Sequence, residues 1–208
     1  MSSVQAAKFN MIEQQIRPWE VLDNRVLSTL DSLSREDFVP EAYRGLAYAD
    51  CQIPLGDGVY MLPPTIEGRM LQSLVIEDDD EVLEVGCGCG YVTACLGRLA
   101  GRVTSLAASD AIIDTASHNV TACGLTNVTF EKAGLADFDR DQAFDVIAVT
   151  ASVSALPEAL KTALKVGGRL FIVVGDAPVM EALLITRVSV SEWTTQSLFE
   201  TVLPRLGI

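Results

Sequence analysis

One segment of the chain combines an acid and three glycines at a spacing that suits a ligand site. It reads Glu84-Val-Gly86-Cys-Gly88-Cys-Gly90-Tyr91, an E-x-G-x-G-x-G pattern that follows one predicted strand and opens a predicted helix. Glycines in such a turn can take positive φ angles and let a ligand approach the backbone, and the first helical turn offers unpaired N–H groups. These residues predict a nucleotide-type ligand site.

The glycine spacing indicates which ligand this site takes. Dinucleotide-binding folds prefer G-x-G-x-x-G, whose third glycine packs helix against strand. Here Glu84 stands two residues before the first glycine, and a carboxylate there suits a positive amino or sulfonium centre better than a pyrophosphate. The pattern therefore favours S-adenosylmethionine. A turn that serves packing alone and a nicotinamide-dependent oxidoreductase are the alternatives.

The cysteines and the histidine do not predict a metal site. A metal site needs three or four converging ligands, whereas the five cysteines lack the paired spacing of a zinc site or a disulfide framework. His118, the only histidine, lies in a predicted helix. We expect no bound metal and interpret the cysteines as packing or loop residues.

The elements that carry the glycine loop are predicted from residue 81 onward. Short β-branched runs alternate there with helical stretches, the pattern of a doubly wound, mostly parallel α/β sheet. The expected strands are 81–86, 102–107, 127–133, 144–150 and 168–174. The expected helices are 91–99, 110–123 and 154–165, with Asp110 and Ser154 as N-caps and with Gly124 and Gly167 at helix ends.

The two ends of the chain are predicted to join this sheet in a single domain, 1–208. Two strand-like segments without a helix between them, 181–190 and 194–203, indicate an antiparallel hairpin at the sheet edge. Helical periodicity in 6–16 and 25–33, followed by a Gly- and Pro-rich loop at 56–64, indicates an N-terminal helical cap with a substrate loop over 1–80. The remainder, 81–208, forms the cofactor-binding sheet.

Composition narrows the classes of partner and compartment. The formal net charge of −13 opposes nucleic-acid binding, which draws its affinity from Lys and Arg on phosphates. The apolar runs are far shorter than the roughly 20 residues that span a bilayer, so no membrane segment is expected. The first residues lack a basic segment followed by an apolar one, which disfavours a secretory signal and predicts the cytoplasm.

An ordered set of motifs resembles the protein-L-isoaspartate (D-aspartate) O-methyltransferase family over nearly the whole chain. The segments are REDFVPEAYRGLAYAD (35–50), IPLGDG (53–58), VLEVGCGCGYVTACLGRLAGRVTS (82–105), FDVIAVTAS (144–152), LPEAL (156–160) and LKVGGRLFIVVG (164–175). The resemblance implies a class I, Rossmann-like methyltransferase. Such an enzyme uses S-adenosylmethionine to methylate the side-chain carboxylate of isoaspartyl residues, a repair of damaged proteins.

The resemblance also implies which residues form the site. The cofactor would contact the glycine loop and the ends of two later strands, at Glu84, Gly86, Gly88, Gly90, Tyr91, Ala107, Gly134 and Leu135. The family's substrate loop, Q-T-I-S-x-P, carries hydroxyls near the reacting carboxylate. At those positions this chain has Tyr60 for the threonine, Met61, and Leu62 for the serine.

Two further departures fall where the family binds adenosine. The family's Val-Glu, whose carboxylate meets the ribose hydroxyls, corresponds to Leu106-Ala107. Its G-D-G, whose Asp meets the adenine amino group, corresponds to Ala133-Gly134-Leu135. Asp110 and Asp137 are the nearest acids that could replace these contacts.

Three functional hypotheses follow from the matches and the departures. The first is methylation of isoaspartyl peptide or protein, and the second is methylation of another carboxylate acceptor that suits the apolar loop. The third is a non-catalytic descendant with impaired cofactor binding that acts as a binding protein. Because an ionised carboxylate is already a nucleophile, catalysis would rest on alignment and desolvation. No general base is needed, and Glu13, Asp57 and Glu67 are interpreted as solvated surface acids.

Overall fold

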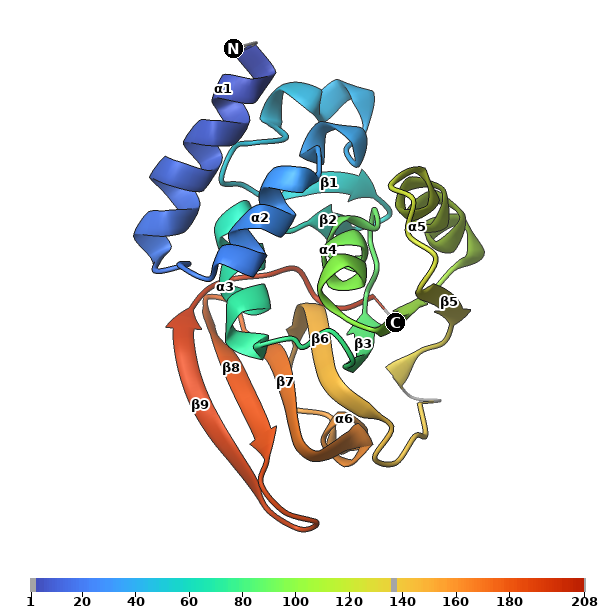
Figure 1. Cartoon of the computed structure of the whole chain (residues 1–208). Helices are drawn as coiled ribbons and strands as arrows, with labels where there is room; N and C mark the ends of the chain where they lie inside the picture. The colour runs from blue at the N-terminus through green and yellow to red at the C-terminus, as the bar shows by residue number, and fades with distance from the viewer. Residues whose placement is uncertain (1–2, 136–137, 208) are drawn as a thin grey trace.

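The large sheet of the computed structural model, which describes residues 3–135 and 138–207, has the strand order β5-β4-β3-β6-β7-β8-β9 (Figure 1). Its parallel strands are β3 (Glu81–Val85), β4 (Arg102–Ala107), β5 (Val128–Lys132), β6 (Phe144–Val153) and β7 (Leu164–Asp176). The antiparallel strands β8 (Val179–Arg187) and β9 (Trp193–Glu200) complete one edge. The predicted fold class is confirmed, including the C-terminal hairpin.

Helices cover both faces of this sheet. The helices are α1 (Ser3–Asn10), α2 (Asn24–Ser32), α3 (Pro64–Leu74), α4 (Tyr91–Leu99), α5 (Asp110–Ala122) and α6 (Glu158–Ala163). Alternate strand residues face opposite ways, so Val82 packs with the N-terminal helices, α3 and α4, whereas Leu83 packs with α6. The first of these two apolar clusters runs from Met11 to Leu203, so the N-terminal cap and the sheet share a core.

The N-terminal region holds more regular structure than the sequence predicted. The predicted helix 6–16 is divided into α1 and a π-helical turn, Met11–Ile16, and short 3₁₀ segments follow at Arg17–Trp19, Arg35–Asp37 and Glu41–Leu46. The supposed loop 56–64 is part of a small hairpin, β1 (Ile53–Gly56) and β2 (Val59–Met61). Asp57 and Gly58 make its two-residue turn with positive φ, as in a type I′ turn.

Several predicted helix ends are corrected. Helix α6 starts at Glu158, not at Ser154, because Pro157 precedes it and proline disfavours helical backbone in the residue before it. Gly167 lies inside β7 and ends no helix. The N-cap of α5 is Ser109, whose side chain accepts from the Ile112 N–H, and Asp110 is the first helical residue. Gly124, with φ +74°, does follow the end of α5.

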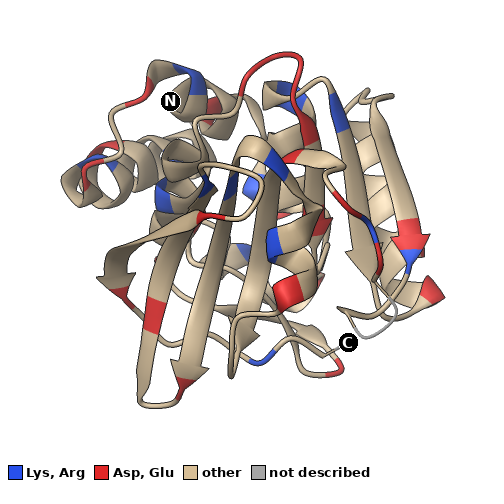
Figure 2. Cartoon of the chain, turned by 90° about the horizontal axis from the view of Figure 1, so that it is seen from below, with Lys and Arg blue, Asp and Glu red and all other residues tan. Residues whose placement is uncertain are grey.

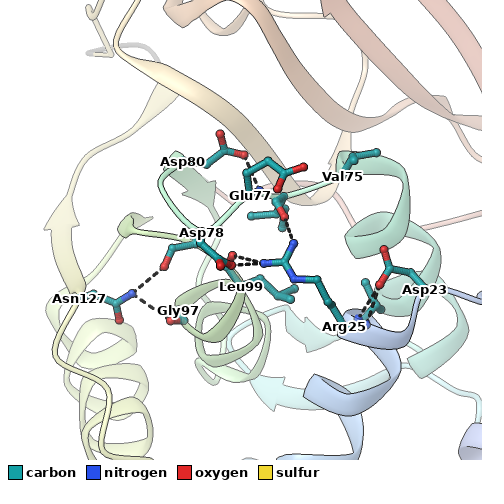
Figure 3. A network of polar contacts seen from close by, with 12 residues as sticks. Asp23, Arg25, Val75, Glu77, Asp78, Asp80, Gly97, Leu99 and Asn127 are labelled. Atoms are coloured by element: carbon teal, nitrogen blue, oxygen red, sulfur yellow. Dashed lines mark hydrogen bonds and ion pairs between the residues drawn. The ribbon is translucent and has the colours of Figure 1, made fainter.

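A polar network ties the cap to the end of the sheet where its parallel strands begin (Figure 3). Arg25 on α2 pairs with Asp78 and donates to the carbonyls of Ile76 (2.6 Å) and Leu99 (3.2 Å). Asp80, next to the start of β3, accepts from the Glu77 N–H at 2.9 Å. These contacts fix the amino end of β3, so the glycine loop at its carboxyl end starts from an anchored strand.

Charged residues and apolar helix length can be followed over the described part of the chain. Lys and Arg lie on several separate elements among Asp and Glu (Figure 2). Within residues 3–135 and 138–207, none of the helices combines the length and the apolar character that crossing a membrane requires.

Candidate functional site

The glycine loop turns sharply from β3 into α4. Gly86, Gly88 and Gly90 all have positive φ, at +98°, +50° and +85°. A Cβ on Gly86 would lie 2.7 Å from the Thr150 Oγ1, and one on Gly90 would lie 2.8 Å from a backbone carbonyl oxygen on α5. Packing therefore requires the first and third glycines, whereas a Cβ on Gly88 would make only ordinary contacts with the side chains of Leu55, at 3.4 Å, and Val59, at 4.0 Å.

A cleft of about 290 Å³ lies over this loop at the carboxyl ends of β3, β4 and β6. From β3 the chain adds β4 and β5 on one side, and it then crosses to add β6 and β7 on the other side of β3. Ligands of open α/β sheets bind at such a topological switch point. The residues that line the cleft are Asp57, Gly58, Val59, Tyr60, Leu62, Gly86, Cys87, Gly88, Ala107, Ala108, Ser109, Ile112, Thr150, Ala151, Pro204, Arg205, Leu206 and Gly207.

The structure brings only part of the predicted site together. Five predicted residues line the cleft: Tyr60, Leu62, Gly86, Gly88 and Ala107. The other described ones stand outside its lining: Met61, Glu84, Gly90, Tyr91, Gly134 and Leu135. Asp137 lies outside the residues that the structure describes.

Glu84 supports the loop from within the core. Its side chain is fully buried and accepts hydrogen bonds from the Thr93 hydroxyl (2.5 Å) on α4 and from the Ser105 hydroxyl on β4. Burial raises the pKa of Glu84 to about 7, and the two hydroxyl hydrogen bonds act in the opposite direction. Glu84 thus joins β3, α4 and β4 directly below the glycine turn.

The raised pKa of Glu84 predicts a pH-dependent stability difference between wild type and Glu84→Gln. The folded-state pKa of about 7 lies above the ordinary value of 4.5, so the fold prefers the protonated acid. The stabilising contribution of the protonated Glu84 is fully present below pH ~4.5 and is lost as the pH rises through ~7.

Glu84→Gln should therefore gain stability over wild type between about pH 5 and about pH 8, by on the order of 1–3 kcal/mol. Denaturant unfolding of both proteins at the two pH values measures this gain. A difference that does not change with pH would show that Glu84 is ionised in the fold throughout.

The substrate-loop positions present an apolar wall to the cleft. The Tyr60 side chain is half-exposed, whereas Leu62 is 3% exposed and offers no hydrogen-bond donor from its side chain. The backbone at Leu62 is held in place by the protein core, because the Leu62 carbonyl accepts a hydrogen bond from the buried Arg35 Nη2 at 3.0 Å. Tyr60 and Leu62, which replace the family's two hydroxyl residues, therefore both line the cleft.

The interpretation of Glu67 as a surface acid is wrong. Glu67 is fully buried on α3 and pairs with the fully buried Arg35. The missed signal is the spacing Glu67, Met70, Leu71 and Leu74, which is that of one buried helix face. Glu13 does lie at the surface, paired with Arg17 at 2.9 Å. Asp57 is exposed at the rim of the cleft.

Beside Ala107, the described lining of the cleft offers no carboxylate side chain. Ala107 ends β4 and is followed in the lining by Ala108 and Ser109. The Asp110 carboxylate points elsewhere, because it accepts a 2.7 Å hydrogen bond from the exposed Lys132, which lowers its pKa. Asp110 therefore does not take the place of the carboxylate that Ala107 lacks.

The C-terminal segment forms a wall that the sequence did not predict. The Ser152 N–H donates to the Pro204 carbonyl at 2.9 Å, and the Leu206 N–H donates to the Ser152 carbonyl at 2.9 Å. This segment returns from β9 along the strand ends (Figure 1) and carries Arg205, the one cation in the described lining. Such pairing over a long sequence separation leaves no local signal.

Comparison with known proteins decides what kind of fold carries this cleft. The sequence model of the protein-L-isoaspartate(D-aspartate) O-methyltransferase family matches residues 6–200. The chain belongs to this family. The methyltransferase is 34% identical over 200 residues to a protein-L-isoaspartate O-methyltransferase of Rhodopseudomonas palustris (strain ATCC BAA-98 / CGA009), with 95% of this chain and 92% of that protein covered.

Other relatives and solved structures agree with this placement. A protein-L-isoaspartate O-methyltransferase of Methylorubrum extorquens (strain PA1) is 38% identical over 181 residues, which covers 87% of this chain and 79% of that one. A Plasmodium falciparum methyltransferase structure in complex with S-adenosyl-L-homocysteine has a TM-score of 0.81 at 20% identity, with 99% of both chains covered. That likeness shows the fold.

Family membership makes the protein an S-adenosylmethionine-dependent methyltransferase, as predicted. The comparisons give no support to the non-catalytic alternative. The observed cleft fits this cofactor class, because the backbone at Gly88 is open to a ligand and the walls are mostly apolar.

Proposed function

We propose that this methyltransferase acts on the side-chain carboxylate of isoaspartyl residues in peptides or proteins. The proposal rests on the position of residues 59–62, which form β2 and the residue after it and are called the β2 loop below. Tyr60 and Leu62 of this loop line the same cleft as the glycine loop. An acceptor held by the β2 loop would therefore meet the cofactor held by the glycine loop.

The chain's own residues contribute alignment and exclusion of water. Gly86 and Gly88 would hold the methionine end of the cofactor through their backbone, and Ala107 and Ser109 border its adenosine end. When bound, the cofactor supplies an electrophilic methyl group on its sulfonium. Leu62 and Leu206 keep water from the acceptor oxygen, which strengthens its attraction to a positive centre. Since the acceptor is ionised, no side chain has to remove a proton.

The charge of the cleft does not favour one carboxylate acceptor over another, because the described lining holds one cation, Arg205, and one carboxylate, Asp57. Arg205 is the only cation among the described lining residues, and its guanidinium pairs at the rim with the exposed Asp176. A different carboxylate acceptor is the second candidate, because Leu62 lacks the hydroxyl that the family's substrate loop carries for isoaspartate. Nucleic acid remains an unsuitable partner because the net charge is −13. We place the protein in the cytoplasm, which is consistent with its five free cysteines.

A transfer assay with two matched peptides tests the proposal. One peptide carries isoaspartate and the other aspartate at the same position, and mass spectrometry detects the methyl ester. We expect methylation of the isoaspartyl peptide alone. If neither peptide is methylated while S-adenosylhomocysteine binds, the acceptor is a different carboxylate and the second candidate replaces the first.

The apolar β2 loop predicts slow turnover of isoaspartyl peptide and a gain from restored hydroxyls. Tyr60→Thr combined with Leu62→Ser should raise turnover by ~5–150-fold, because a buried carboxylate needs donors worth about 1–3 kcal/mol. Initial rates at saturating cofactor measure this effect. Met61→Ser, which adds a hydroxyl beside these positions on a residue outside the cleft lining, is the control and should bring no gain. High wild-type turnover that the double variant fails to raise would show the hydroxyls to be dispensable.

A further inference from the structure

A small recess opens from the cleft beneath the β2 loop. Its volume is about 20 Å³, enough for a group the size of a water molecule or an ammonium. Glu67 and Tyr91 line the recess and do not line the cleft itself. The recess is continuous with the cleft, because both are lined by Tyr60, Leu62, Gly86, Cys87, Gly88 and Thr150.

Two buried polar atoms in the lining residues of this recess have no hydrogen-bond partner among the residues that the structure describes. They are the Glu67 Oε1 and the Tyr91 hydroxyl oxygen. Glu67 is 0% exposed and Tyr91 is 1% exposed, so bulk water does not satisfy them. Because buried polar groups in native proteins are nearly always hydrogen-bonded, these two atoms point to a group that enters from the cleft.

The charges around Glu67 determine which group this is. Arg35 pairs with the other carboxylate oxygen, Oε2, and also donates to the carbonyls of Ala47 (2.7 Å) and Leu62 (3.0 Å). Burial raises the pKa of Glu67 to about 7, with Arg35 acting in the opposite direction and the nearby Asp50 adding to the rise. Two carboxylates, Glu67 and Asp50, outnumber the single guanidinium of Arg35, so an anion fits poorly here, whereas a hydrogen-bond-donating cation would satisfy Oε1.

We propose that Glu67 Oε1 and the Tyr91 hydroxyl accept hydrogen bonds from the α-ammonium group at the methionine end of the cofactor. The assignment rests on the proposed function, which brings that end of the cofactor to Gly86 and Gly88 beside the recess. Glu67 then has two roles. Oε2 fixes the β2 loop through Arg35, and Oε1 selects a ligand that carries an amino group.

A comparison of two ligands with two proteins tests the assignment. The affinities of wild type and Glu67→Gln, as full chains, are measured by calorimetry for S-adenosylhomocysteine and for its analogue without the amino group. We expect Glu67→Gln to weaken S-adenosylhomocysteine by ~10–100-fold, as for loss of a charge-assisted hydrogen bond, and to leave the analogue within about twofold. Equal weakening of both ligands would overturn the assignment and leave Glu67 with the loop-fixing role alone.

A second variant keeps the test informative if Glu67→Gln fails to fold. Tyr91→Phe removes only the hydroxyl and leaves the Arg35–Glu67 pair in place, so it should weaken S-adenosylhomocysteine by ~3–10-fold and spare the analogue. Unchanged affinity of Tyr91→Phe for both ligands, with an unfolded Glu67→Gln, would overturn the assignment. If wild type binds the two ligands equally, the assignment fails while the proposed function stands; if wild type binds neither, both fail.

Asp80→Asn is the matched control for the loss of a buried carboxylate. Asp80 is 8% exposed and pairs with Arg169 at 2.7 Å, at the opposite end of β3 from the glycine loop (Figure 3). This variant should lose stability yet bind both ligands as wild type does. If it reproduced the selective loss of S-adenosylhomocysteine, general destabilisation would explain the result and the assignment would be overturned.

Discussion

Replacing Gly88 by valine is expected to abolish cofactor binding while leaving the fold intact. Gly88 borders the cleft, and its backbone is where a ligand can approach most closely. A valine side chain would occupy that space, and its preference for negative φ would also disturb the turn, which has φ +50° here. Affinity for S-adenosylhomocysteine, measured by equilibrium dialysis, should fall by at least about 100-fold, or about 2.8 kcal/mol.

The backbone strain of this change can be separated from its effect on the site. Gly124 also has a positive φ, +74°, with no atom within 4 Å of a built Cβ, and it follows α5 outside the cleft lining. Gly124→Val therefore imposes similar strain, on the order of 1–2 kcal/mol, without blocking the cleft. It should bind S-adenosylhomocysteine as wild type does. If Gly88→Val binds normally too, the cofactor site lies elsewhere.

Replacing Ala107 by glutamate is expected to strengthen cofactor binding by ~10–100-fold. Ala107 lines the cleft at the position where the family resemblance implies a carboxylate on the ribose hydroxyls. One hydrogen bond to a charged group contributes about 1.5–3 kcal/mol. The new carboxylate would not compete with Asp110, since Lys132 already holds that side chain. Calorimetric titration of the variant and wild type with S-adenosylhomocysteine measures the gain.

Ala108→Glu is the control for this change. Ala108 also lines the cleft but is exposed and follows the end of β4, so the same charge is added at the neighbouring position. We expect little gain from it. Tight wild-type binding that Ala107→Glu does not improve would show that other groups already satisfy the ribose hydroxyls, and that the adenosine end is not impaired.

The parallel sheet could be predicted because its signals are local. Helix α4 begins at Tyr91 as predicted, since glycines precede it and buried residues recur along it. The hairpin of β8 and β9 followed from two strand-like runs without a helix between them. Helix α3 was missed because Pro63 and Pro64 were interpreted as the end of the loop 56–64, although Pro64 is the first residue of the helix and proline is favoured in the first helical turn.

The site was predictable only where one short segment supplies it. Gly86 and Gly88 follow from the glycine loop alone. The contact of Arg35 with Glu67 joins residues that are 32 positions apart, and the pairing of Ser152 with Pro204 in the C-terminal segment joins residues that are 52 positions apart. Neither contact leaves a periodic pattern in the sequence. The buried Arg35–Glu67 pair and the C-terminal wall of the cleft could therefore be recognised only in the folded structure.

Calorimetric titration of the wild-type protein with S-adenosylhomocysteine tests the central claim most directly. The claim is that the cleft above Gly86 and Gly88 remains a functional cofactor site although Ala107 and Gly134 replace the expected acids. We predict saturable binding at one site per chain, with an affinity that Gly88→Val removes. Absence of binding by the folded wild-type protein at millimolar ligand would contradict the claim.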